Sequence, residues 1–195
     1  MSTWDQMYEG TPPWDIGRPQ PAFVDLVERG IIKHNPILDV GCGTGENALF
    51  LAAKGFETVG VDGSQLAIEK AKRKAQDRKL KATFLVRDAL ELASLRRQFA
   101  AVTDCGLFHT FDDEDRPRFA EQVARALKPG GTYCMMAFSD KEPTDWGGPR
   151  RVSKPEIRAA FPPPKFRVRA IEDARFETHH HESGGRAYLS IIDRP

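Results

Sequence analysis

The sequence has few cysteines, no long apolar run and almost no net charge, and each shortage argues against a class of protein. Its three cysteines, Cys42, Cys105 and Cys134, are widely spaced among 195 residues. An odd, scattered set argues against a disulfide framework or a zinc site and favours free thiols in the cytoplasm. The longest apolar runs span only a few residues, which is too short to cross a membrane. The polar and aromatic residues 1–10 do not have the order of a secretory signal.

The near-balance of charge bears on the possible partners. A net charge of +1 provides no basic excess with which to bind nucleic acid. We therefore expect neither a nucleic-acid nor a membrane partner, and a small molecule becomes the expected ligand.

Strand and helix patterns alternate along most of the chain. Short apolar runs predict strands at 37–40, 58–61, 83–86, 100–104 and 132–138. Helical spacing predicts helices near 22–31, from the glycine turn to about 55, after Ser64, near 114–127 and after Ser153, where Glu156 completes a capping box. Two further strands, near 165–178 and 186–192, are expected to form a hairpin that turns at 183–185. This order predicts one doubly wound α/β domain over 1–195, a mainly parallel sheet with helices on both faces and one antiparallel strand.

Three alternating glycines follow the first strand. Gly41, Gly43 and Gly45 form the pattern G-x-G-x-G, which differs from the G-x-G-x-x-G of dinucleotide-binding sites. A tight turn that leads into a helix N-terminus is the usual place for an adenosyl cofactor in such sheets. Glu46 follows directly and would repel a pyrophosphate at that point. The pattern therefore favours a cofactor without phosphates, such as S-adenosylmethionine.

Aspartates follow the next two strands, at the edge where ligands of open α/β sheets bind. Asp62 lies 21 residues after Gly41, a distance that suits a carboxylate accepting hydrogen bonds from a ribose diol. Asp88, followed by Ala89, could accept a hydrogen bond from an adenine amino group. Either aspartate alone is weak evidence for a cofactor site. The glycine turn, Asp62 and Asp88 together, however, occur in the order that such a site requires.

At this point a family resemblance is evident. The stretches ILDVGCGTGENALFLA, VGVDGS, RDA and ALKPGG, which lie within residues 37–139, resemble the ordered motifs of the class I S-adenosylmethionine-dependent methyltransferases. The resemblance implies a seven-stranded sheet of order 3-2-1-4-5-7-6 with strand 7 antiparallel. It also implies S-adenosylmethionine as cofactor, S-adenosylhomocysteine as product, and a further cofactor contact just after strand 4, at Cys105.

The N-terminal segment narrows the resemblance. TWDQMYEGTPPWDIGRPQP is similar to the start of the plant halide/thiocyanate methyltransferases and, more loosely, of the thiopurine S-methyltransferases. The resemblance implies that 1–20 folds over the cofactor, while 21–195 forms the core; on pattern alone, its aromatics could simply anchor the terminus. The candidate cofactor-binding residues are Trp4, Tyr8, Trp14, Gly41, Cys42, Gly43, Asp62, Asp88, Ala89 and Cys105.

The expected reaction is an in-line displacement that moves a methyl group to a small molecule: a thiol, a halide-like anion or a small aromatic heteroatom. Thiolates, iodide and thiocyanate need no general base, whereas a phenol could use His109, which lies near the end of strand 4. His109 could equally be a packing residue. The acceptor pocket is expected to include Phe108, Phe111 and Trp146. Two alternatives remain, a phenol or quinol O-methyltransferase with His109 as base and a non-catalytic adenosyl-binding module.

The sequence 179–181 is a run of three histidines, which raises the question of a metal site. Adjacent residues on a strand point to opposite faces, so three in a row do not easily share one ion. No metal site is therefore expected.

Overall fold

A seven-stranded sheet forms the centre of the computed structural model, which describes residues 3–143, 145 and 147–195. The strands are β1 (Ile37–Val40), β2 (Thr58–Asp62), β3 (Ala82–Val86), β4 (Phe99–Cys105), β5 (Leu127–Phe138), β6 (Arg167–Thr178) and β7 (His181–Asp193). Their order is β3-β2-β1-β4-β5-β7-β6. β7 runs antiparallel to β5 and β6, and the other neighbours pair in parallel. The predicted fold class and strand order are therefore confirmed.

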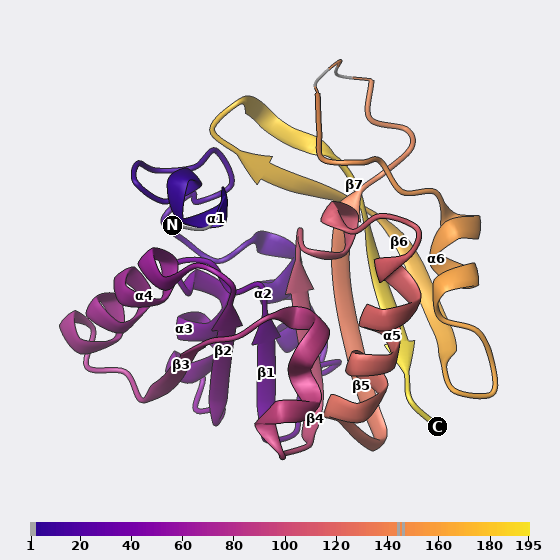
Figure 1. The fold of residues 1–195 in the computed structure, drawn as a ribbon, viewed down its shortest axis with the longest axis horizontal. Helices are drawn as coiled ribbons and strands as arrows, with labels where there is room; N and C mark the ends of the chain where they lie inside the picture. The colour runs from indigo at the N-terminus through magenta and orange to yellow at the C-terminus, as the bar shows by residue number, and fades with distance from the viewer. Residues whose placement is uncertain (1–2, 144, 146) are drawn as a thin grey trace.

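Helices cover both faces of this sheet (Figure 1). They are α1 (Thr3–Met7), α2 (Pro21–Glu28), α3 (Glu46–Ala53), α4 (Gln65–Asp77), α5 (Asp115–Ala126) and α6 (Lys154–Ala160), with the 3₁₀ helices η1 (Ala89–Leu95) and η2 (Phe108–Thr110). Alternation along β1 explains the two layers, because Ile37 packs with α2 and α3 whereas Leu38 and Val40 pack with η1, α5 and α6. In the described part of the chain, no helix is long and apolar enough to cross a bilayer.

Local sequence signals set several helix starts as expected. Ser64 Oγ accepts a hydrogen bond from Ala67 N at 3.1 Å and caps α4. At α6, Ser153 N donates to Glu156 Oε2 at 2.7 Å and Glu156 N donates to Ser153 Oγ at 3.3 Å, which completes the capping box.

The position of the terminal hairpin turn differs from the prediction. The chain turns at His179 and His180, and Ser183–Gly185 lies inside β7, where Gly185 pairs with Phe176. The prediction of a turn at 183–185 was therefore wrong. A Cβ at Gly185 would lie 2.6 Å from Cε1 of Phe138, so this glycine allows close packing within the sheet rather than a chain reversal.

Candidate functional site

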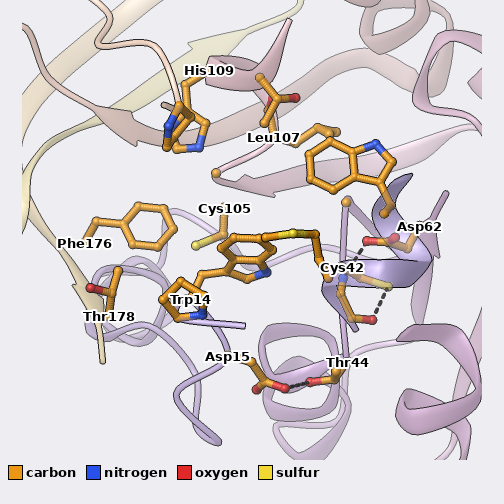
Figure 2. A pocket seen from close by; sticks show the side chains of 18 of the residues that line it. Trp14, Asp15, Cys42, Thr44, Asp62, Cys105, Leu107, His109, Phe176 and Thr178 are labelled. Atoms are coloured by element: carbon orange, nitrogen blue, oxygen red, sulfur yellow. Dashed lines mark hydrogen bonds between the residues drawn. The ribbon is translucent and has the colours of Figure 1, made fainter. Parts of the chain in front are cut away.

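A cavity of about 1120 Å³ lies at the carboxyl ends of the parallel strands. Figure 2 shows Asp62, Cys42 and Thr44 along one side, His109, Phe176 and Thr178 along the other, and Trp14 between them. We call the first side the glycine-loop end (Gly41–Gly43 with Asp62). The second, which we call the aromatic end, consists of His109, Phe138 and Phe176. The volume exceeds the roughly 300–1,000 Å³ of ordinary ligand pockets, so two small molecules can fit together.

The glycine loop requires glycine for both conformation and space. Gly41 and Gly43 have φ angles of +66° and +53°, a region that other residues rarely adopt. A Cβ at Gly41 would lie 2.9 Å from Cβ of Leu107, and one at Gly43 would lie 2.8 Å from Oη of Tyr8. The loop therefore presents bare backbone to the cavity, as close approach to a ligand requires.

Asp62 is fixed against this loop by two backbone hydrogen bonds. Gly43 N donates to Asp62 Oδ2 at 2.8 Å, and Ser64 N donates to Asp62 Oδ1 at 2.9 Å. Burial raises the pKa of Asp62, and these two hydrogen bonds oppose that shift. Each carboxylate oxygen keeps acceptor capacity beyond its one backbone bond, and the residue lines the cavity.

Glu46 has partners that the sequence pattern did not reveal. Lys74 Nζ donates to its Oε1 at 2.7 Å, and Arg78 donates to both carboxylate oxygens at 2.8 Å. Burial opposes ionisation, but the hydrogen bonds from Arg78 and Lys74 lower the pKa of Glu46 below its usual value. Its charge is therefore balanced, which weakens the argument that Glu46 would repel a pyrophosphate.

The N-terminal segment lies between α4 and the tip of the β6–β7 hairpin (Figure 1). Ser64 Oγ donates to Asp5 Oδ1 at 2.7 Å, and Thr44 Oγ1 donates to Asp15 Oδ2 at 2.8 Å. At the hairpin, His179 N donates to the Pro13 carbonyl at 2.8 Å. The segment is thus attached at both ends of the cavity mouth.

The three aromatic residues of this segment all line the cavity. Trp14 Nε1 donates to Tyr8 Oη at 3.1 Å, and their rings meet edge to face with centroids 6.2 Å apart. Tyr8 is 5% exposed and Trp4 is 44% exposed. Burial and the nearby Asp62 carboxylate raise the pKa of Tyr8, so its hydroxyl stays neutral.

The remaining candidate cofactor residues also line the cavity. Asp88 follows β3, and its Oδ1 accepts from Leu90 N at 2.8 Å to cap η1. Cys105 ends β4, and Cys42 lies in the glycine loop. Burial raises the pKa of both thiols well above the usual value, so neither is a reactive thiolate.

His109 is held in one protonation state by its surroundings. Phe138 N donates to His109 Nδ1 at 3.2 Å, which places the ring proton of the neutral imidazole on Nε2. Burial, together with the positive charge of Arg116, lowers the pKa of His109 to about 3, against the opposing effect of a hydrogen bond to the Gly106 backbone. A base with an occupied lone pair and so low a pKa is poorly suited to take a proton at neutral pH.

The predicted acceptor pocket is only partly assembled in the cavity lining. Phe111 lines the cavity. Phe108 instead lies in the core, with its ring centroid 5.5 Å from that of Phe161 and 6.4 Å from that of Phe119. The 3₁₀ turn of η2 directs Phe108 into the core and the next residue, His109, toward the cavity. Trp146 lies outside the described residues.

Known proteins resemble this chain in both sequence and fold. A family described as a methyltransferase domain matches residues 37–131. The 2-heptyl-1-hydroxyquinolin-4(1H)-one methyltransferase of Mycobacteroides abscessus is 39% identical over 149 residues, which cover 75% of this chain and 65% of that relative. "Probable thiol methyltransferase 2" of Arabidopsis thaliana is 31% identical over 173 residues, which cover 87% of this chain and 76% of the relative.

The chain belongs to the class I S-adenosylmethionine-dependent methyltransferases. Among solved structures, one described as "Conversion of a Disulfide Bond into a Thioacetal Group during Echinomycin Biosynthesis" is 33% identical, with a TM-score of 0.88 over 98% of this chain and 90% of that one. A magnesium protoporphyrin IX methyltransferase from Synechocystis with bound S-adenosylhomocysteine shares the fold, at 17% identity and a TM-score of 0.72 over 90% of this chain and 81% of that one. The cofactor of the protein described by this chain is S-adenosylmethionine.

The bare backbone at Gly41 and Gly43 and the remaining acceptor capacity of Asp62 fit this cofactor. In the described ranges, no cluster of His, Cys, Asp and Glu side chains is arranged to hold a metal ion.

Sequence reasoning missed two rings of the methyltransferase's aromatic end. Phe138 ends β5 at the carboxyl edge, so its place in the chain was a usable signal. Phe176 comes from β6, whose register depends on the hairpin turn. Because the turn was predicted at 183–185 rather than at 179–180, no local signal placed Phe176 beside Gly106.

Proposed function

We propose that this methyltransferase moves a methyl group to a small acceptor whose nucleophilic atom is already negatively charged near neutral pH. Thiolates, halide-like anions and acidic hydroxyl groups on small aromatic rings meet this condition. The observation that carries the proposal is the engaged Nδ1 of His109, which accepts from Phe138 N at 3.2 Å. Because that lone pair is occupied, His109 does not accept a proton and only lines the acceptor site as a neutral side chain. The acceptor therefore ionises without help from His109.

The two ends of the cavity have separate roles in this proposal. S-adenosylmethionine supplies the electrophilic methyl group and the leaving group. The backbone of Gly41–Gly43 approaches the cofactor, Asp62 accepts hydrogen bonds from its ribose, and Asp88 with Ala89 contacts its base. Cys42 and Cys105 complete the wall by van der Waals contact, because their raised pKa values keep both thiols neutral.

The N-terminal segment covers this site in the same proposal. Trp4, Tyr8 and Trp14 all line the cavity, and aromatic faces attract a sulfonium cation. Two hydrogen bonds, between Asp15 and Thr44 and between Pro13 and His179, hold this cover in place. The cover excludes water, which would otherwise solvate the nucleophile during methyl transfer. The chain then works as one domain, with 1–20 as cover and 21–195 as core.

A second candidate is O-methylation of an aromatic hydroxyl. The 39% identity to 2-heptyl-1-hydroxyquinolin-4(1H)-one methyltransferase favours it. This version requires a hydroxyl acidic enough to ionise by itself, rather than a phenol deprotonated by His109.

We also propose a reducing compartment, the cytoplasm, as the place of action, because Cys42, Cys105 and Cys134 are free thiols.

The test combines binding with turnover. Calorimetry with S-adenosylmethionine and S-adenosylhomocysteine measures cofactor binding, and mass spectrometry then follows methylation of thiophenol, iodide, thiocyanate, 1-hydroxyquinolin-4(1H)-one and phenol. We expect turnover of the ionised acceptors, with a rate that follows the ionisation of each acceptor, and none of phenol. A rate on phenol that His109→Gln abolishes would overturn the proposal. Tight cofactor binding without turnover of any acceptor would indicate a non-catalytic adenosyl-binding module instead.

A further inference from the structure

Three rings of the aromatic end lie nearly parallel to one another. The ring centroids of His109 and Phe138 are 5.3 Å apart with planes at 4°, and those of Phe138 and Phe176 are 4.8 Å apart at 24°. The centroids of His109 and Phe176 are 6.1 Å apart at 28°. If the three rings were stacked in a single column, the centroids of the two outer rings would be about twice as far apart as those of neighbouring rings. The rings therefore form a triangle, in which Phe138 contacts both of the others and His109 and Phe176 lie side by side.

Two glycines from different elements make room for these rings. Gly106 follows β4 with φ of +85°, and a Cβ there would lie 2.9 Å from the ring of Phe176. Gly185 on β7 pairs with Phe176, and its Cβ would lie 2.6 Å from the ring of Phe138. Real Cβ atoms essentially never come this close, so a larger residue at either position would displace a ring. The ring group is thus a built feature of the fold, and all three rings line the cavity.

Two arginines of the cavity lining are already paired with carboxylates. Arg18 pairs with Glu177 at 2.5 Å, and Arg150 pairs with Asp113 at 2.8 Å. The third ring, His109, is neutral, because burial lowers its pKa to about 3. A small inorganic anion would gain little at such a wall. A flat ring would gain the stacking energy of aromatic pairs, a factor of about 2 to 12 in binding beyond the area that it buries.

We propose that the aromatic end binds a planar aromatic acceptor by ring stacking and that Phe176 is the residue that sets this preference. The inference rests on the proposed function and adds the class of substrate to it. The ring of the acceptor lies against His109 and Phe176, and its nucleophilic atom faces the glycine-loop end. Arenethiols and acidic hydroxy-heteroarenes fit this description best, and we expect iodide and thiocyanate, which have no ring to stack, to be poorer acceptors.

A matched pair of thiols separates stacking from simple hydrophobicity. Phenylmethanethiol and cyclohexylmethanethiol carry the same –CH₂SH group on a flat and on a puckered ring. We expect kcat/KM, expressed per ionised thiolate so that the different acidities of the two thiols cancel, to be about tenfold higher for the phenyl compound. We also expect it to bind the protein saturated with S-adenosylhomocysteine about tenfold more tightly by calorimetry. Equal values in both measurements would overturn the inference.

Variants at Phe176 then test the residue itself. Phe176→Leu should reduce the phenyl preference to about twofold, mainly through KM, while Phe176→Tyr retains it. Phe56→Leu removes a partly buried ring that is not part of the cavity lining and should leave the preference unchanged. S-adenosylhomocysteine affinity and the unfolding midpoint report whether each variant is folded. An undiminished preference in folded Phe176→Leu, or its loss in Phe56→Leu, would contradict the role of Phe176.

The two proposals fail in distinguishable ways. Turnover of cyclohexylmethanethiol as fast as its phenyl partner would remove the aromatic preference and leave base-free methyl transfer intact. Preferential binding of the phenyl compound to the S-adenosylhomocysteine complex, with no turnover of any acceptor, would support the ring site and overturn the proposed function.

Discussion

Replacing Asp62 by Asn is the most direct test of the glycine-loop end. The substitution keeps the shape of the side chain but turns one carboxylate oxygen into an NH₂ group. Gly43 N and Ser64 N each donate to a different oxygen, at 2.8 and 2.9 Å. One of these two backbone N–H groups must therefore face another donor in Asp62→Asn.

The structure sets the size of the expected loss. An unsatisfied buried N–H group costs about 1–3 kcal/mol. Burial raises the pKa of Asp62, so removing its charge offsets part of this cost, and we expect the free energy of unfolding to fall by about 1–2 kcal/mol. Cofactor affinity should fall further. One lost charge-assisted bond to the ribose is worth about 1.5–3 kcal/mol, or about a 10- to 150-fold weaker Kd.

Urea unfolding and calorimetry with S-adenosylhomocysteine measure the two losses separately. Asp77→Asn is the matched control, because Asp77 is an exposed residue at the end of α4 and its substitution should change neither quantity. Reduced stability with unchanged affinity would show that Asp62 only supports the loop. Unchanged stability and affinity together would refute the reasoning.

Three further experiments test other parts of the site and fold. The pKa of His109 is about 3 in the folded protein, below its unfolded value of 6.5. Between these two values the unfolded chain binds a proton that the folded chain does not. The contribution of His109 to stability is therefore fully present above pH 6.5 and is lost as the pH falls toward 3. Relative to His109→Gln, the wild type should lose about 1.4 kcal/mol per pH unit between pH 6 and 4 in urea unfolding, and parallel curves would contradict this. Gly43→Ala should cost about 1–2 kcal/mol and weaken cofactor binding, and Tyr8→Phe in the same chain should restore part of both; strictly additive effects would exclude the contact between the two residues. Ser153→Ala removes the cap of α6 and should lower the unfolding free energy by about 1 kcal/mol, whereas an unchanged midpoint would show that the cap is dispensable.

Local patterns were sufficient for the order of the strands and of the α-helices from α2 onward, but not for α1 or the 3₁₀ helices η1 and η2. The run ILDV is buried on every residue, and its β-branched and apolar residues next to a glycine turn predict the strand at its observed bounds. Ser153 and Glu156 determine the start of α6 through hydrogen bonds between residues three apart. Such signals lie within one turn or one strand, so the sequence expresses them directly.

Contacts across the sheet were beyond the reach of these patterns. Gly184 and Gly185 have the composition of a turn, but the pairing of β6 with β7 places them inside a strand. Phe108 and His109 are neighbours in sequence, yet one is buried in the core and the other lines the cavity. The side of a short 3₁₀ turn that faces a ligand depends on what packs against it.

The sequence by itself determined the family, and through the family resemblance the strand order and the cofactor, because the resemblance is carried by motifs of a few residues in a fixed order along the chain. Tertiary structure decided the chemical state and surroundings of the acceptor site. His109 is neutral because Phe138 N from β5 occupies its Nδ1 and because burial excludes water from its ring. The ring group exists because Gly106 and Gly185, 79 residues apart in the sequence, leave space for the side chains of Phe176 and Phe138. These properties arise from atoms brought together across the sheet, and no local pattern encodes them.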